Sequence, residues 1–136
     1  MPFVVDSTVA LAWLLPDEQS AAVEALADAL ETSAASAPGI WPLEVRNALV
    51  TAQRRKRITD RETDRLLKAL DALPVELDAA PPRETCTATV ACARKHGLTT
   101  YDAAYLELAQ RRGLPLATLD SRLAEAARKA GVAVLP

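Results

Sequence analysis

The sequence predicts an α/β protein in which a parallel β-sheet of about five short strands is covered by helices on both faces. Short apolar runs alternate along the chain with helical patterns of ten or more residues. The apolar runs are nearly continuous rather than half polar, as expected for strands buried on both faces. The length of 136 residues suits one domain of ordinary size, so we expect residues 1–136 to form a single domain.

The first half of the chain begins with a predicted strand at 3–5 (FVV). A helical run, TVALAWLL, follows and is ended by a proline. Residues 18–31 place their apolar side chains at amphipathic helix spacing, and a second strand is expected at 37–41 (APGIW). Pro42 then stands in the first turn of the helix LEVRNALVTAQRRK, where proline is tolerated best.

The second half opens with Thr59 and Glu62, which form a capping-box pair at the start of a leucine-rich helix. A strand is expected at 74–77 (PVEL), and a helix over 83–97 ends at its glycine. The remaining elements are, in order, the strand-like run LTT, a helix over 101–112, the strand LPLATL, a helix over 121–130 and a terminal VAVL.

The apolar start of the chain resembles a secretory segment only superficially. No basic residue precedes Arg46, and Asp6 interrupts the apolar run. Secretory signals begin with a positively charged region, so we expect neither a signal peptide nor a membrane span, and we expect a cytoplasmic protein.

Cys86 and Cys92 fall on one predicted helix. Their separation along it is about 9 Å, beyond the roughly 7 Å that a disulfide allows between Cα atoms. We expect both to be reduced core residues. A metal site is the lesser alternative, because no further cysteine or histidine cluster accompanies them.

The net charge of −2 argues against a general nucleic-acid coat, but the charges are unevenly distributed. Residues 1–45 carry seven acids and no base, whereas RRKR at 54–57 concentrates positive charge. If a bound cation occupied four of the 18 acids, 16 bases would face 14 remaining acids, and the outer surface could attract a polyanion.

Four acids stand at the start of predicted helices, directly or nearly after strand runs: Asp6, Glu44, Asp102 and Asp120. The carboxyl ends of parallel strands lie along one edge of a sheet, so this topology can gather all four there. Taken singly, each acid is also a good helix start, as an N-cap or a partner of the helix dipole, and Asp120 is the most cap-like.

As a set, the four carboxylates predict a metal site. Two unit charges about 5 Å apart repel by about 3 kcal/mol at an effective dielectric near 20, so a cluster needs raised pKa values or a cation. Oxygen ligands without cysteine or histidine suit Mg²⁺ or Mn²⁺. Such a site activates water against a phosphodiester, which makes a metal-dependent nuclease the leading interpretation.

The stretches VVDSTV, PLEVRNAL, TTYDAAYLELA and LPLATLDSRLAEAARKAGV, in this order and spacing, resemble the PIN-domain ribonucleases, and specifically the VapC-type toxins of bacterial type II toxin–antitoxin systems. The resemblance covers essentially the whole chain and implies a PIN-like α/β/α sandwich. It also implies that Asp6, Glu44, Asp102 and Asp120 are the acids that bind Mg²⁺ or Mn²⁺. An endoribonuclease that leaves a 5′-phosphate, a homodimer and a cognate VapB-type antitoxin are further implications of the resemblance alone.

Four other residues are expected near the site. The resemblance makes Ser7 and Thr118 groups that support the acids or position substrate, and Asn47 joins the site in some similar proteins. Arg46, two residues from Glu44, is a candidate for the mouth of the site, and a structural ion pair is the equal alternative. The RRKR segment fits either phosphate contact or a solvated helix end.

Several features point away from other functions. His96 ends a helix and is expected to cap it rather than act as a base. A phosphoacceptor receiver domain needs paired acids after the first strand, and an Asp-x-Asp phosphohydrolase needs an acid where Thr8 stands. The alternative from another class is a catalytically inactive PIN-like module that binds RNA or a protein partner.

Overall fold

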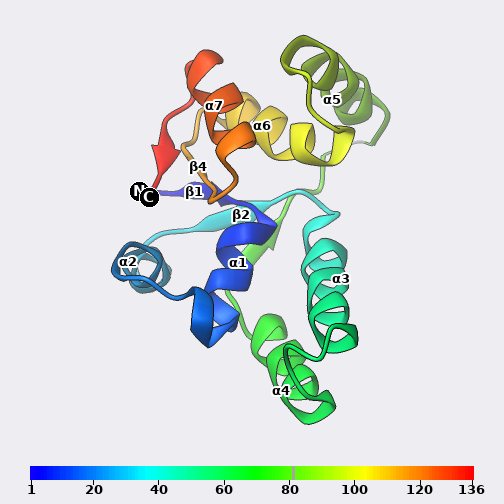
Figure 1. Ribbon diagram of the computed structural model, residues 1–136. Coiled ribbons are helices and arrows are strands. Elements are labelled where there is room, and N and C mark those ends of the chain that lie inside the picture. The colour runs from blue at the N-terminus through cyan, green and yellow to red at the C-terminus, as the bar shows by residue number, and fades with distance from the viewer. Residues whose placement is uncertain (81) are drawn as a thin grey trace.

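The computed structural model describes residues 1–80 and 82–136, and its centre is a five-stranded sheet (Figure 1). The strand order is β3-β2-β1-β4-β5, and every neighbouring pair is parallel. The predicted fold class is therefore confirmed. The strands are short: β1 Phe3–Val5, β2 Ala35–Ala37, β3 Val75–Leu77, β4 Leu116–Ala117 and β5 Val134–Leu135.

Helices cover both faces of the sheet. Figure 1 shows α1 to α4 on one side and α5 to α7 on the other. The helices are α1 Ser7–Leu14, α2 Ala21–Ala29, α3 Trp41–Arg54, α4 Asp60–Asp71, α5 Pro82–His96, α6 Thr100–Arg112 and α7 Ser121–Lys129, with a short 3₁₀ helix, η1, at Pro16–Glu18. The central strand β1 is consequently fully enclosed, with its three residues at 0–1% exposure.

The order of the strands creates a switch point between β1 and β4. The chain leaves β1 through α1 on one face and leaves β4 through α7 on the other. Loops that diverge in this way open a crevice at the carboxyl ends of the two strands, which is where open α/β sheets bind their ligands. Asp6 directly follows β1, and Thr118 directly follows β4, so both lie at this crevice.

Two strand predictions need correction. The second strand is Ala35–Ala37 rather than 37–41, because the small buried residues 35–37 pair with β1 and β3, and α3 begins at Trp41. The run LTT is not a strand. Thr99 caps α6 instead, accepting the amide of Asp102 at 3.1 Å, so Asp102 lies in the first turn of a helix that follows another helix.

The cysteine prediction is half right. Both cysteines are free, and Cys92 is buried as expected. Cys86 is exposed, and it lines an open pocket between α5 and the start of α6. Among the described residues, no helix is both long enough and apolar enough to cross a membrane.

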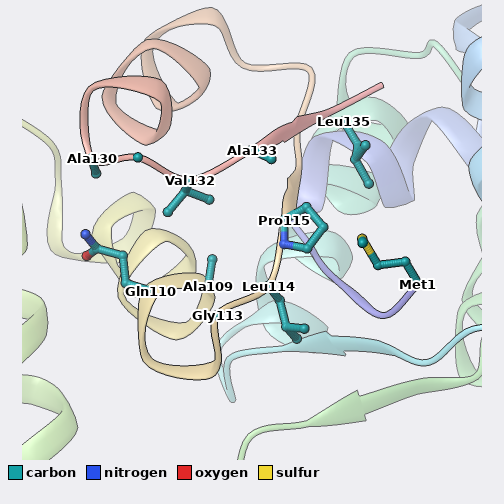
Figure 2. A pocket seen from close by; sticks show the side chains of 11 residues that line it. Met1, Ala109, Gln110, Gly113, Leu114, Pro115, Ala130, Val132, Ala133 and Leu135 are labelled. Carbon is teal, nitrogen blue, oxygen red and sulfur yellow. The ribbon is translucent and has the colours of Figure 1, made fainter.

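A pocket of about 600 Å³ lies at the amino ends of β4 and β5, away from the edge where the acids gather (Figure 2). Figure 2 shows Leu114 and Pro115, which lead into β4, beside Met1 and Leu135. None of the side chains that line this pocket is charged. The pocket therefore offers apolar surface and no acid–base or metal chemistry.

Asp78, at the carboxyl end of β3, ties α6 to the edge of the sheet. Its carboxylate accepts hydrogen bonds from Arg111 at 2.6 Å and Arg112 at 2.8 Å, and Arg112 also donates to the buried Ser36 hydroxyl on β2. The Arg111 guanidinium also pairs with the buried Glu107 one turn earlier in α6. The hydrogen bonds from Arg111 hold the pKa of Asp78 below its usual value.

We predict that Asp78→Asn lowers the free energy of unfolding at neutral pH by about 1–2 kcal/mol, because charge-assisted hydrogen bonds are lost. A carboxyl group with a lowered pKa stabilises the fold above its unfolded-state pKa, and this contribution disappears as pH falls through the folded-state pKa. Urea unfolding of both proteins across the acidic range checks this. A stability difference that is unchanged in acid would contradict it.

Candidate active site

The Asp6 carboxylate is the most buried acid of the site, with 3% of the residue exposed. It forms the N-cap of α1, accepting the Val9 amide at 3.1 Å, and it also accepts the hydroxyls of Thr8 at 2.7 Å and Thr118 at 2.5 Å. Burial raises the pKa of Asp6, and these hydrogen bonds oppose the rise. The side chain is thus fixed by three donors from two elements.

Two threonine hydroxyls connect Asp6 to the loop after β4. Thr118 donates to Asp6 and accepts the Asp120 amide at 3.0 Å, while Thr8 donates to Asp6 and accepts the Leu119 amide at 2.9 Å. Asp120 in turn forms the N-cap of α7, and its carboxylate accepts the amides of Arg122 and Leu123. The loops after β1 and β4 are therefore held together by side chains at the switch point.

Glu44 reaches the same edge from α3. The indole of Trp41, at the start of α3, donates to the Asp6 carbonyl at 3.3 Å and fixes the helix against the end of β1. Glu44 lies one turn further on, and its carboxylate accepts the Tyr105 hydroxyl from α6. Burial is the first cause that raises the pKa of Glu44, and the negative charge of Asp102 adds to it.

Asp102 completes the group from the first turn of α6. Burial raises its pKa, and the charge of Asp120 raises it further, while the nearby Arg122 acts in the opposite direction. Asp102 thus interacts electrostatically with Glu44 on one side and Asp120 on the other. The structure brings the four predicted acids to one edge of the sheet, from the N-caps of α1 and α7 and the first turns of α3 and α6.

The four acids form a row: Asp102 interacts electrostatically with Glu44 and with Asp120, and the Thr118 hydroxyl joins Asp120 to Asp6. Among the residues that the structure describes, no three histidine, cysteine, aspartate or glutamate side chains form a group that could hold a metal ion. Like charges repel, and the carboxylates of Asp6, Glu44 and Asp120 each turn to a hydroxyl or amide donor of their own.

The donor chemistry of this row nevertheless fits a hard divalent cation. Its members offer only oxygen, and Mg²⁺ commonly uses one or two carboxylates and keeps several waters. Glu44 with Asp102, or Asp102 with Asp120, supplies such a pair. Burial, and after it a neighbouring carboxylate, raises the pKa of Glu44 and of Asp102, and a cation beside them would offset both effects.

The other residues expected at the site lie in different places. Thr118 is in the centre of it. Ser7 begins α1 half-buried, and the hydroxyl on Asp6 comes from Thr8 instead. Arg46 pairs with Asp71 of α4, which is the ion-pair alternative, and the exposed Asn47 lines a shallow pocket between α1 and α3.

The basic segment 54–57 lies at the end of α3, and all four of its side chains are exposed. Arg57 pairs with Asp17 and Glu18 of η1 at 2.9 and 2.7 Å. One of the four charges is therefore neutralised within the chain. The segment is a solvated helix end in this structure, and contact with RNA remains a prediction.

Three residues that contact the acids were not predicted as part of the site: Thr8, Trp41 and Tyr105. Thr8 carries a signal in the sequence, since it stands two residues after Asp6, where a hydroxyl can turn back onto a capping carboxylate. Tyr105 stands three residues after Asp102, on the same helix face. Trp41 carries none, because its contact with the Asp6 carbonyl joins residues 35 positions apart.

A doubly wound parallel sheet with acids gathered at its switch point defines the class of α/β proteins that bind a ligand at the carboxyl edge of the sheet. The PIN domain model matches residues 3–129, and the chain belongs to the PIN-domain family. The family predicted from the sequence is thereby confirmed.

Individual relatives agree with this assignment. Ribonuclease VapC3 of Pyrobaculum aerophilum is 35% identical over 92% of this chain and 94% of its own length. The crystal structure of PAE2754 from Pyrobaculum aerophilum is similar with a TM-score of 0.74 at 23% identity, covering 98% of this chain and 89% of the other. A toxin–antitoxin complex from Klebsiella pneumoniae contains a similar chain, with a TM-score of 0.57 at 16% identity over 90% of this chain and 89% of the other.

Proposed function

We propose that this protein is a Mg²⁺- or Mn²⁺-dependent endoribonuclease that acts as the toxin of a toxin–antitoxin pair. One observation carries the proposal: Asp6, Glu44, Asp102 and Asp120, spread over 115 positions of the chain, meet at the switch point of the sheet. The similarity to a VapC ribonuclease over nearly the whole chain supports RNA as the substrate.

The residues would divide the work according to their surroundings. Glu44 with Asp102, or Asp102 with Asp120, would hold the cation, because each pair interacts electrostatically. Asp6 is saturated by three donors and fully buried, so it would provide a fixed negative charge at the floor of the site. When bound, Mg²⁺ or Mn²⁺ supplies a water of lowered pKa and neutralises charge on a phosphodiester.

The proposed partners follow from the relatives. RNA would be the substrate, as the name of the VapC3 relative indicates. An antitoxin partner is supported by the toxin–antitoxin complex from Klebsiella pneumoniae, which contains a chain of similar fold, and its VapB type is proposed from the family resemblance. A homodimer is proposed from the family resemblance. The alternative, a catalytically inactive module that binds RNA or protein, is disfavoured because all four acids are present at the site.

The test is cleavage of defined RNAs by the purified protein with Mg²⁺, with Mn²⁺, and with a chelator in excess. We expect products with 5′-phosphates only when a divalent ion is present. Intact RNA in every condition, together with specific RNA binding, would favour the inactive module. Growth arrest on inducing the gene without its neighbour tests the toxin role separately from the nuclease activity.

A further inference from the structure

Tyr105 is a buried tyrosine whose hydroxyl is aimed at one acid of the candidate site. Only 1% of the residue is exposed, and its hydroxyl donates to Oε1 of Glu44. It lies one turn after Asp102 on α6, so the same helix face carries an acid and the group that holds a second acid. The proposed reaction assigns no task to this hydroxyl.

The surroundings keep this hydroxyl a hydrogen-bond donor. Burial raises the pKa of Tyr105 far above its usual value, and the neighbouring carboxylates raise it further. The contact also joins elements that are distant in sequence, because Tyr105 and Glu44 are 61 positions apart. The hydrogen bond from Tyr105 therefore connects α6 to α3 at the site.

Glu44 has a particular need for such a partner. Its side chain has more rotatable bonds than the three aspartates of the site, so more conformational freedom is lost when it binds an ion. Asp6 and Asp120 are oriented by capping the helices that follow them, but Glu44 lies inside α3 and caps nothing. Loss of a hydrogen bond that orients a metal-binding carboxylate typically weakens metal affinity by about 10- to 100-fold.

We propose that Tyr105 is a positioning residue of the metal site: its hydroxyl holds one oxygen of Glu44 and leaves the other free for a divalent cation shared with Asp102. This inference rests on the proposed metal-dependent function. It adds a residue that neither touches RNA nor binds the ion itself, and it predicts that removing one buried oxygen atom weakens metal binding.

The first test is Mn²⁺ binding to the full chain by isothermal titration calorimetry, without RNA. We expect Tyr105→Phe, which keeps the ring, to weaken the dissociation constant about tenfold or more. Tyr101→Phe is the matched control, because it removes a hydroxyl from the same helix at a residue that is 62% exposed, and it should bind like the parent. Leu108→Val, a fully buried change on α6, controls for loss of stability and should also bind like the parent.

The outcomes separate this inference from the proposed function. A parent protein that binds no Mn²⁺ overturns both. A parent that binds, with Tyr105→Phe binding equally well, overturns the positioning role alone. Equal weakening in Tyr105→Phe and Leu108→Val, at matched loss of melting temperature, assigns Tyr105 to packing and also overturns the role.

A second measurement leaves Tyr105 intact. The chain has two tyrosines, so Tyr101→Phe protein labelled with ¹³C at the tyrosine ζ carbon gives a single tyrosine resonance. We expect this resonance to shift during an Mg²⁺ titration and to report the same dissociation constant as calorimetry carried out with Mg²⁺, because the hydroxyl rests on a metal-binding carboxylate. A resonance that stays fixed at saturating Mg²⁺ would contradict the proposal even if Tyr105→Phe failed to fold.

Discussion

Asp102→Asn is expected to abolish metal-dependent RNA cleavage, with a loss of about a thousandfold or more, while the folded protein becomes at least as stable as the parent. A divalent ion contributes several kcal/mol of charge stabilisation to phosphodiester cleavage, and each 1.36 kcal/mol corresponds to about tenfold in rate. Asp102 is the acid that interacts with both Glu44 and Asp120, so its charge is central to holding the ion. Initial rates on a defined RNA in Mg²⁺ and Mn²⁺ measure the loss.

The stability half of this prediction follows from the raised pKa of Asp102. A carboxyl group whose pKa is higher in the folded state destabilises the fold once pH rises through its unfolded-state pKa, and the penalty is complete above the folded-state pKa. Asparagine has no such penalty. Urea unfolding in the presence of a chelator should therefore show the variant to be more stable at neutral pH, with no gain at a pH below the range in which aspartate titrates.

Asp28→Asn is the matched control, because Asp28 is an exposed acid on α2 outside the site and loses the same charge. It should cleave RNA like the parent. If Asp102→Asn also cleaved RNA at the parent rate, Asp102 would not belong to the active site, and the interpretation of the acidic row would fail with it.

Thr118→Val is expected to reduce both stability and cleavage, because one hydroxyl serves two groups at the switch point. Valine keeps the shape of threonine but leaves the buried Asp6 carboxylate without its donor at 2.5 Å and the Asp120 amide without its acceptor at 3.0 Å. Unsatisfied buried groups cost about 1–3 kcal/mol. Loss of a hydrogen bond that orients a metal-site carboxylate should reduce cleavage about 10- to 100-fold.

The control for this variant is Thr63→Val. Thr63 is also a buried threonine, and its hydroxyl donates to the Thr59 carbonyl inside α4, away from the acids. It should lose some stability and no activity when both proteins are assayed well below their melting temperatures. Thr118→Ser keeps the hydroxyl and should restore most of the cleavage. A Thr118→Val protein that is destabilised but fully active would show that Thr118 serves folding only.

The structure also decides at which acid an amide substitution should stabilise the protein in the absence of a metal ion. Repulsion alone predicts that replacing any acid of the cluster by its amide stabilises the protein without an ion. Asp6 does not fit this expectation, because it accepts three hydrogen bonds and caps α1, and an amide cannot accept all of them. Asp102 has less support from donors and stronger interaction with a neighbouring acid, so it alone is expected to show the gain clearly.

The local sequence determined most of the elements and the location of Asp6 and Asp120, although it misplaced the second strand and predicted a strand before Asp102 where the structure has a helix cap. Apolar strands that alternate with helices specify a parallel sheet, and parallel strands place all their carboxyl ends at one edge. Asp6 and Asp120 could therefore be assigned to the same edge although 114 positions separate them. The capping box at Thr59 and Glu62 could likewise be predicted from the sequence, because its hydrogen bonds lie within four residues.

Only the tertiary structure decided how each carboxylate is held. The contacts of Tyr105 with Glu44, Trp41 with the end of β1, and Thr118 with Asp6 join residues 61, 35 and 112 positions apart, and no local pattern encodes such distances. The same holds for Arg46, which packing directed to Asp71 rather than to the site. Backbone preferences act over a few residues, whereas these side-chain contacts form only after the helices have packed on the sheet, so the sequence specified where the acids stand and the fold specified their partners.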